Sequence, residues 1–326
     1  MTPFVSSFRA LAAVACVVCS VASLAQTQTP YPSRPLRVIV PFAPGGSADV
    51  IGRIVMQRTG VELGQNMVIE NRSGANSNIG IEIAANASAD GYTVLYNTSS
   101  IIFNRFIYPK LGYDTFRDFA PVALTAVVPQ VLVVIPSLPV RNLKEFIAHL
   151  RANPGKLDYA SMGQGNIAHL TTALFLKMHK LDAVHVPYKG APFAYADLIG
   201  GRTQFYFATI TSAAPFVKDN RLRALAVTSF EPSAIVPGLP TMAEAGVPGY
   251  ESQSRTALFA PAKTPPAVIA RIHAEVARAL NQPEVKERLF AAGLEVIAST
   301  PQEATAVIKS EMARMGRLID EAGLRE

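Results

Sequence analysis

The chain has 326 residues, of which 49% are hydrophobic and 17% charged, a balance that excludes an intrinsically disordered protein. Its formal net charge is +6, but charges of both signs alternate along the chain, so it lacks the basic stripe of a nucleic-acid-binding protein. The mild positive balance favours small anionic partners instead, and the length suffices for two modest lobes.

The first 25 residues are typical of a secretory signal peptide. Arg9 precedes an apolar segment over residues 11–24, and a small-residue cleavage site ends at Ala25. The segment is too short, and wrongly flanked, for a membrane span. Both cysteines, Cys16 and Cys19, lie inside it, so the mature protein would contain no disulfide, catalytic thiol or cysteine–metal site. Acylation of Cys16, which would make a lipoprotein, remains the alternative.

A strand, a glycine turn and a helix follow the leader. The apolar run of residues 36–40 stops at Pro41, the turn contains Gly45 and Gly46, and a helix begins near Ser47. This arrangement places backbone N–H groups and the positive end of a helix dipole at the carboxyl end of a strand, the edge at which open α/β sheets bind ligands. We interpret it as one wall of an anion-accepting cleft.

Short apolar strands alternate with helices along the rest of the chain, which predicts an α/β fold with a largely parallel sheet. We predict strands at residues 67–70, 92–96, 122–128, 131–135, 159–161, 184–187, 204–207, 222–228 and 256–260. We predict helices at residues 47–60, 79–86, 142–152, 191–199, 213–219, 266–280 and 301–322, and one that opens after a second glycine turn at 162–165.

Two stretches divide this pattern into lobes. The β-rich runs around Pro129 indicate a crossover into a second lobe, and the Pro/Gly-rich residues 232–249 indicate the return. The two glycine turns, around Gly45 and Gly163, then recur once in each lobe.

The residues between these landmarks carry a family resemblance that covers essentially the whole mature chain. Its carriers are YPSRPLRVIVPFAPGGSAD (31–49), VIENRSGANSNIG (68–80), ADGYTVL (89–95), VPYKG (186–190), RLRALAVTS (221–229), LPTMAEAGVPGYE (239–251) and FAPAKTP (259–265). In this order, behind a signal peptide, they resemble the Bug family, the extracytoplasmic solute receptors of tripartite tricarboxylate transport systems.

The resemblance implies a two-lobed type II periplasmic-binding-protein fold in which each lobe is a mostly parallel sheet flanked by helices. Residues 26–126 and 251–326 would form lobe one, residues 127–250 lobe two, and two crossover hinges near Ala126 and Glu251 would flex. The receptor would be a periplasmic monomer without a cofactor. It would close on a small carboxylate and deliver it to a membrane permease.

The resemblance also implies which residues hold the ligand in lobe one. One carboxylate would lie against the first glycine turn, at Phe42, Pro44, Gly45, Ser47 and Asp49. Asp49 is awkward beside an anion, and three roles stay open for it: binding a ligand ammonium, holding bridging water, or only complementing the helix dipole. The hydroxyls of Thr98 and Ser99 are also candidate ligand contacts. The alternative is that they only cap a turn.

In lobe two the second glycine turn would hold the far end of the ligand, through Ser161, Gly163, Gly165 and Asn166. His169, one helical turn further on, is interpreted as a packing residue, and residues 205–207 as core. At Ala208 and Thr209 this chain departs from the family, in which an acidic residue is common there.

Arg255 stands where the family commonly has an aromatic residue. We predict that it projects into the cleft and pairs with a second carboxylate, since guanidinium binds carboxylate bidentately. Together with the acid missing at Ala208, this would favour a dianion over an amino acid. A solvated arginine beside the hinge is the alternative.

Other classes of protein fit the sequence less well. An enzyme would need a nucleophile–base pair, a metal set or a cofactor loop, and the five histidines show no metal-ligand spacing. A transcription regulator would need a helix-turn-helix. A sensory receptor that presents its loaded form to a membrane kinase stays open. Aliphatic dicarboxylates, aromatic carboxylates and nicotinate-like acids are all candidate ligands.

Overall fold

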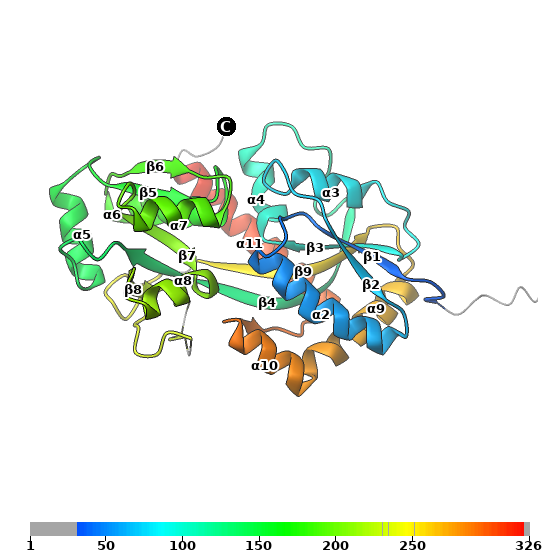
Figure 1. The fold of residues 1–326 in the computed structure, drawn as a ribbon. Helices are drawn as coiled ribbons and strands as arrows, with labels where there is room; N and C mark the ends of the chain where they lie inside the picture. Colours follow the sequence, from blue (N-terminus) through cyan, green and yellow to red (C-terminus); the bar gives the residue numbers. More distant parts are fainter. Residues whose placement is uncertain (1–30, 230, 234, 251, 323–326) are drawn as a thin grey trace, which may run out of the picture. The chain divides into compact units, whose positions relative to one another are not determined.

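One long strand, β4 (Phe119–Val134), runs through both parts of the sheet. The computed structural model describes residues 31–229, 231–233, 235–250 and 252–322 (Figure 1). The chain divides into two units, Met1–Ser33 and Arg34–Glu326, and the second unit contains the strands and helices. The predicted signal peptide, with Cys16 and Cys19, lies outside the described residues, as does Glu251 at the predicted return hinge.

Strand β1 (Leu36–Val40) lies at the centre of the first part of the sheet. It pairs in parallel with β2 (Met67–Asn71) and β3 (Thr93–Thr98). Strand β9 (Gln253–Pro261) then joins β3 in antiparallel register, and β4 (Phe119–Val134) joins β9. Four of the five residues of β1 are buried, as expected for a strand covered on both faces. We call this part lobe one.

The second part of the sheet, which we call lobe two, has the same construction. Strand β5 (Asp158–Ser161) pairs in parallel with β6 (Val184–Pro187) and β7 (Phe205–Thr209). The end of β4 pairs in antiparallel register with β7 and with β8 (Arg223–Val227). Each part is therefore parallel except where it meets the crossing strands.

Strand β4 changes partners at one point. It pairs with β9 as far as Pro129, opposite Gln253, and from Gln130 onward it pairs with β7. The prediction of two separate runs on either side of Pro129 is wrong, because this proline continues one strand of 16 residues. Pro129 has no N–H to donate. It lies where β4 changes partners, so its missing hydrogen bond interrupts neither of the two strand pairings. In Figure 1 the long β4 and β9 lie side by side.

Helices flank both parts, at bounds close to those expected. They are α2 (Ser47–Leu63), α3 (Asn78–Ala85), α4 (Ser100–Ile107), α5 (Leu143–Ala152), α6 (Ile167–His179), α7 (Ala191–Ile199), α8 (Ile210–Lys218), α9 (Pro266–Asn281), α10 (Pro283–Ala291) and α11 (Pro301–Ala322). The short strand β10 (Glu295–Val296) pairs with β4. Helices α4 and α10 and strand β10 were not predicted.

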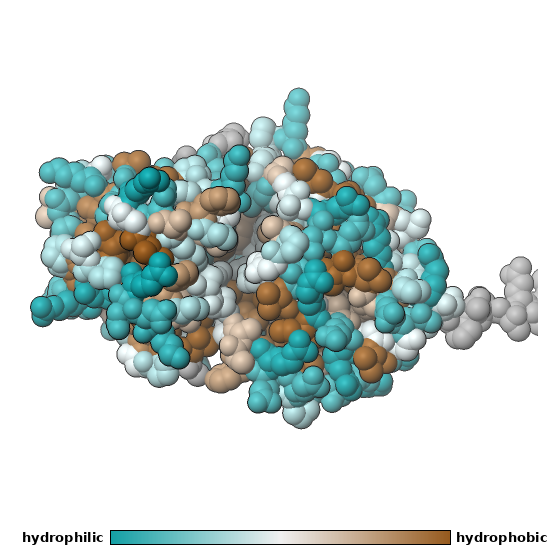
Figure 2. Space-filling view, in the orientation of Figure 1, coloured by the Kyte–Doolittle hydropathy of each residue, from teal (hydrophilic) through white to brown (hydrophobic). Residues whose placement is uncertain are grey.

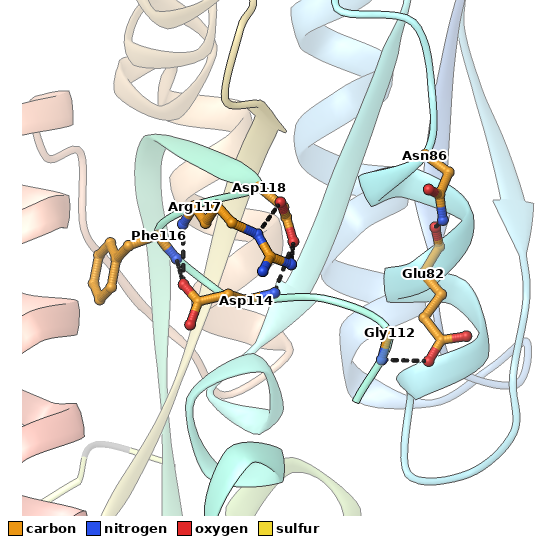
Figure 3. A network of polar contacts seen from close by, with 7 residues as sticks. All are labelled: Glu82, Asn86, Gly112, Asp114, Phe116, Arg117 and Asp118. Carbon is orange, nitrogen blue, oxygen red and sulfur yellow. Dashed lines mark hydrogen bonds and ion pairs between the residues drawn. The ribbon is translucent and has the colours of Figure 1, made fainter. Parts of the chain in front are cut away.

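The loop before β4 is fixed by its own polar contacts (Figure 3). The Asp114 carboxylate accepts the N–H groups of Phe116 and Arg117, each at 3.0 Å. The Asp118 carboxylate accepts the N–H of Asp114 at 2.7 Å and the guanidinium of Arg117. These bonds hold the chain where it turns into the crossover strand.

Helix α6 joins the apolar cores of the two lobes. Phe175, on its second half, is fully buried in the core of lobe two. Leu170, on its first half, is buried instead in the core of lobe one, together with Ile107 of α4 and Met315 and Ile319 of α11. In the part of the chain that the structure describes, no helix has both the length and the apolar character needed to cross a bilayer.

Candidate functional site

A large cavity opens between the two lobes, along the carboxyl ends of their parallel strands. Its volume is about 2610 Å³, and Figure 2 shows it as a hollow between the parts that carry α7 and α2 in Figure 1. Small-molecule sites usually occupy about 300–1,000 Å³. The cleft therefore has more room than one small ligand fills.

The N-terminal ends of six helices border this cavity. Residues at or next to the N-caps of α2, α3, α4, α6, α7 and α8 line it. Among these six, only α6 has an N-cap residue, Asn166, whose side chain accepts the first N–H groups, and in α4 the Thr98 hydroxyl accepts the N–H of Ser100 at 3.3 Å. Helix N-termini carry partial positive charge and orphan N–H donors, so the described part of the cavity wall is suited to anions.

The charged side chains along the wall point to the same conclusion. Among the described residues that line the cavity there is no aspartate or glutamate, whereas Lys189, Lys218, Arg221 and Arg223 do line it. The Arg223 guanidinium donates to the carbonyl of Val140 at 2.6 Å. Electrostatic attraction toward an anion is thus not opposed by any carboxylate in the wall that the structure describes.

Asp49 holds the first glycine turn by a hydrogen bond to its backbone. Its carboxylate accepts the N–H of Gly45 at 2.9 Å, the amide of Asn71 at 2.8 Å and the guanidinium of Arg53 at 2.9–3.0 Å. Burial raises the pKa of Asp49, but these hydrogen bonds outweigh it and the pKa is lowered overall. Asn71 also donates to the carbonyl of Phe42 at 3.0 Å. Asp49 is 3% exposed and outside the cavity wall.

A strained segment lies beside this turn. Gly74 is followed by Ala75, Asn76 and Ser77, and all four have positive φ, of 136°, 46°, 47° and 77°. Consecutive left-handed non-glycine residues are rare, since each costs about 1–2 kcal/mol. The Asn104 amide holds the segment by donating to the Asn76 carbonyl at 2.9 Å. All four residues line the cavity.

Three hydroxyl groups from separate elements continue the wall of lobe one. Ser77 and Ser100 are hydrogen-bonded at 2.8 Å, and Thr98 donates to Ser100 at 3.3 Å. Ser99 instead donates to Glu311 of α11 at 3.3 Å and accepts the N–H of Arg255. The hydroxyls of Thr98 and Ser99 are neighbours in the sequence, but only that of Thr98 faces the cavity, whereas that of Ser99 faces α11 and β9.

The second glycine turn is held by side chains of its own lobe. The N–H of Gly163 donates to the Ser161 hydroxyl at 3.1 Å, and that of Gly165 to Nδ1 of His169 at 3.1 Å. Asn166 caps α6 by accepting the N–H groups of Ala168 and His169. An added Cβ on Gly165 would lie 2.6 Å from Ile107 of α4, so this turn directly meets lobe one.

The structure brings most of the predicted site residues to one cavity. Those that line it are Phe42, Pro44, Gly45, Ser47, Thr98, Gly163, Gly165 and Asn166. Asp49, Ser99 and Ser161 do not line it but bond to the residues that do or to their neighbours. Whether any of them touches a ligand stays a prediction.

Arg255 and Ala208 lie elsewhere. The Arg255 guanidinium pairs with buried Glu311 at 3.3 Å and is not part of the cavity wall. This arrangement contradicts the expectation that Arg255 projects into the cleft, because its charge is matched inside lobe one. Ala208 is fully buried in β7, opposite Val131, and its neighbour Thr209 lines the cavity instead. Residues 205–207 are buried core, as predicted.

Sequence reasoning missed several residues of the wall. The turn after β6 contributes Tyr188, Lys189 and Gly190, and the start of α8 contributes Thr211 and Ser212 beside the already noted Thr209. Both turns follow the carboxyl end of a strand, the position that pointed to the two glycine turns. That position, rather than glycine content, is the signal that would have found them.

Comparison with known proteins places these features in a family. The model of the tripartite tricarboxylate transporter family receptor matches residues 51–324. A UPF0065 protein from the tcbD-tcbE intergenic region of Pseudomonas sp. strain P51 is 38% identical over 96% of this chain and 94% of its own length. Protein BugT of Bordetella pertussis is 35% identical over 90% of this chain and 91% of its own length.

Solved structures of similar proteins carry ligands. R. palustris Rpa4515, solved with adipate, is 35% identical, with a TM-score of 0.85 over 90% of this chain and 98% of that one. MatC (Rpa3494) of Rhodopseudomonas palustris, solved with bound malate, is 30% identical, with a TM-score of 0.81 over 89% of this chain and 100% of that one. Both bound molecules are small carboxylic acids.

Proposed function

Since the chain belongs to the Bug family of tripartite tricarboxylate transporter receptors, we propose that it is a periplasmic receptor that captures a small carboxylate between its lobes. The observation that supports this is the cavity wall: its described part contains no carboxylate side chain and is bordered by six helix N-termini. Such a wall attracts an anion and rejects a cation.

The proposed ligand is a dicarboxylate that meets both glycine turns. In lobe one the uncapped N-terminus of α2, with Ser47, would hold one carboxylate, and the hydroxyls of Thr98 and Ser100 would complete that end. In lobe two the turn at Gly163 and the start of α7 would hold the other. The adipate-bound and malate-bound relatives support this class of ligand.

Closure would come from bending of the two crossing strands. On the lobe two side they are tied together: Thr228 donates its N–H to Gln130 at 2.8 Å, and its hydroxyl donates to the carbonyl of Ser252. Since β4 and β9 are also paired on the lobe one side, as far as Pro129 opposite Gln253, we propose that they bend together near the predicted boundaries of lobe one (26–126 and 251–326) and lobe two (127–250). A ligand that touches both lobes would shift the balance toward the closed state.

A thermal-unfolding screen followed by calorimetry tests the ligand class. The panel contains adipate, malate, benzoate and nicotinate, with lysine ethyl ester as the cationic control. An acid at about one hundred times its Kd should raise the free energy of unfolding by about 2.7 kcal/mol, and the cation should have no effect. Preference for the cation, or no response to any carboxylate, would contradict the proposal.

Delivery to a membrane permease is tested in cells. Uptake of the labelled acid should be lost when either the receptor or the tripartite permease is deleted. Uptake that persists without the permease, combined with a lost transcriptional response to the acid, would point to the sensory role instead.

A further inference from the structure

Two imidazole rings lie stacked directly beneath the second glycine turn. The rings of His169, on α6, and His185, on β6, have centroids 4.0 Å apart and are inclined by 12°. Tyr159 of β5 continues the stack, 4.9 Å from His185. His169 is 7% exposed and His185 is half-buried, and neither lines the ligand cavity.

Both imidazoles are connected to the turn by hydrogen bonds. The N–H of Gly165 donates to Nδ1 of His169 at 3.1 Å, so this nitrogen must hold a lone pair rather than a proton. Nε2 of His185 lies 2.6 Å from the Ser161 hydroxyl, which in turn accepts the N–H of Gly163 at 3.1 Å. The N–H of Gly165 is therefore hydrogen-bonded directly to His169, and the N–H of Gly163 is linked to His185 through the Ser161 hydroxyl.

Lobe one holds its turn in the same way, but with a charged acceptor. There the N–H of Gly45 donates to Asp49, four residues later, at 2.9 Å. In lobe two the N–H of Gly165 donates to His169, also four residues later. Asp49 is an anion matched by Arg53, whereas the lobe two acceptor carries no charge. An uncharged acceptor adds no repulsion toward an anionic ligand end beside it.

We propose that His169 is the positioning residue of the second glycine turn, the uncharged counterpart of Asp49, and that the stack with His185 keeps it in place. The inference rests on the proposed function for its consequence on ligand affinity, but not for the hydrogen bond itself. It also explains how Gly165 is kept against Ile107, the point at which the turn meets lobe one.

The titration of the two rings agrees with this role. Burial lowers the pKa of His169 to about 4, and burial together with the neighbouring His169 lowers the pKa of His185 to about 4. The other titratable group in the stack, Tyr159, is buried and has a raised pKa. Both imidazoles are therefore uncharged at neutral pH, the form that accepts the Gly165 N–H.

Three variants of His169 separate its properties. His169→Asn keeps an uncharged acceptor near the Nδ1 position, His169→Phe keeps the stacked ring without the acceptor, and His169→Asp keeps an acceptor with a negative charge. Thermal unfolding of each variant checks that it is folded. The readouts are NMR hydrogen exchange of the Gly165 amide without ligand, and calorimetry with adipate and with hexanoate, a monoanion of the same chain length.

We expect His169→Phe to speed exchange of the Gly165 amide by about fivefold or more, the effect of one lost hydrogen bond of about 1 kcal/mol, and His169→Asn to restore it to within about twofold of the wild type. We expect His169→Asp to weaken adipate by at least tenfold more than hexanoate. Equal exchange in the Phe and Asn variants would overturn the inference, and so would equal losses for the two acids. The exchange measurement decides it without a ligand, so failure of adipate to bind the wild type would count against the proposed function alone.

Discussion

At the scale of single residues, Asp49 gathers three donors from different segments while only 3% of it is exposed. Its lowered pKa means that the ionised form is favoured in the folded chain. The stability that it contributes is therefore present above its ordinary pKa and is lost as the pH falls through the lowered value.

Asp49→Asn tests this role. The substitution keeps the shape but removes the charge, and we expect it to lower the free energy of unfolding at pH 7 by about 1.5–3 kcal/mol, the range for hydrogen bonds to a charged group. Urea titration measures the change. The control is Asp90→Asn, since Asp90 pairs with Arg34 in an exposed ion pair and should cost less than about 1 kcal/mol. Equal losses in the two variants would show that Asp49 is no more than a surface pair.

The imidazole pair predicts a stability change in a different pH range. Unfolded histidine titrates near 6.5, whereas the pKa values of His169 and His185 are both about 4. Since the unfolded chain binds protons first on acidification, the free energy of unfolding should fall between about pH 6.5 and pH 4. Buried His169 alone would contribute on the order of 3 kcal/mol to this fall, and the more exposed His185 less.

Denaturant titrations of the wild type and His169→Asn between pH 7.0 and pH 4.5 measure this contribution. We expect the loss of stability over this interval to be smaller in the variant by about 2 kcal/mol. His179, whose pKa is also lowered, titrates in both proteins and cancels in the difference. Parallel pH profiles would show that His169 does not titrate as described.

Arg255 shows what residue-scale reasoning from sequence lacks. The predicted strand began one residue after it, at 256, and its partner Glu311 lies on α11, far along the chain. Whether an arginine points to a ligand or to a buried carboxylate depends on the packing of two distant elements. The sequence alone contains no local pattern that reports such a pair.

At the scale of elements, the left-handed segment from Gly74 to Ser77 stores backbone strain beside the ligand cavity. A glycine adopts φ of 46° without the steric cost that alanine has there, although it loses more entropy on folding. We expect Ala75→Gly to change the free energy of unfolding by no more than about 0.5 kcal/mol, or to raise it.

The matched control for this prediction is Ala313→Gly. It makes the same chemical change at a position inside α11, where glycine should cost about 0.5–1 kcal/mol. Thermal unfolding of both variants gives the comparison. A loss at Ala75 as large as the loss at Ala313 would mean that the segment is not strained.

Sequence patterns predicted an element well where the burial of its residues follows their apolar pattern. Buried parallel strands such as β1 read as continuous apolar runs, and α11 as an amphipathic helix. Helix α4 was missed although its apolar and polar residues follow a helical period, because its eight residues cover only about two turns directly after a strand. Pro129 was interpreted as a break because a proline usually ends a strand, whereas here it lies at the change of strand partners.

At the scale of the whole described unit, we expect closure to require both glycine turns in their present shapes. Gly45 and Gly163 have φ of 80° and 117°, and an added Cβ at either would meet no close atom. A side chain at these positions therefore acts through the backbone conformation and not through crowding. Gly46, next to Gly45, does not have this left-handed φ.

Small-angle scattering of the variants tests the closure. Adipate should compact the wild type and Gly46→Ala, whereas Gly45→Val and Gly163→Val should show negligible compaction at the same adipate concentration. Circular dichroism controls for the fold of each variant. Undiminished compaction in both valine variants would exclude the turns from the closing mechanism.

The shared position of α6 also constrains how the lobes move. Because Leu170 is buried in the core of lobe one while Phe175 is buried in that of lobe two, the lobes are joined by a packed helix as well as by the two crossing strands. The second glycine turn predicted where this helix begins, but the sequence could not show that Leu170 would pack in a different core from Ala168 and Phe175.

The cavity wall without carboxylates has a practical consequence for purification and assay. A surface that offers helix N-termini and lysines to any anion does not distinguish an organic acid from phosphate or sulfate at high concentration. The phosphate in phosphate-buffered saline would therefore compete weakly with the ligand. We expect the Kd for adipate to be lower in a buffer whose anion is bulky. We expect protein dialysed against such a buffer to bind adipate more tightly than protein kept in phosphate.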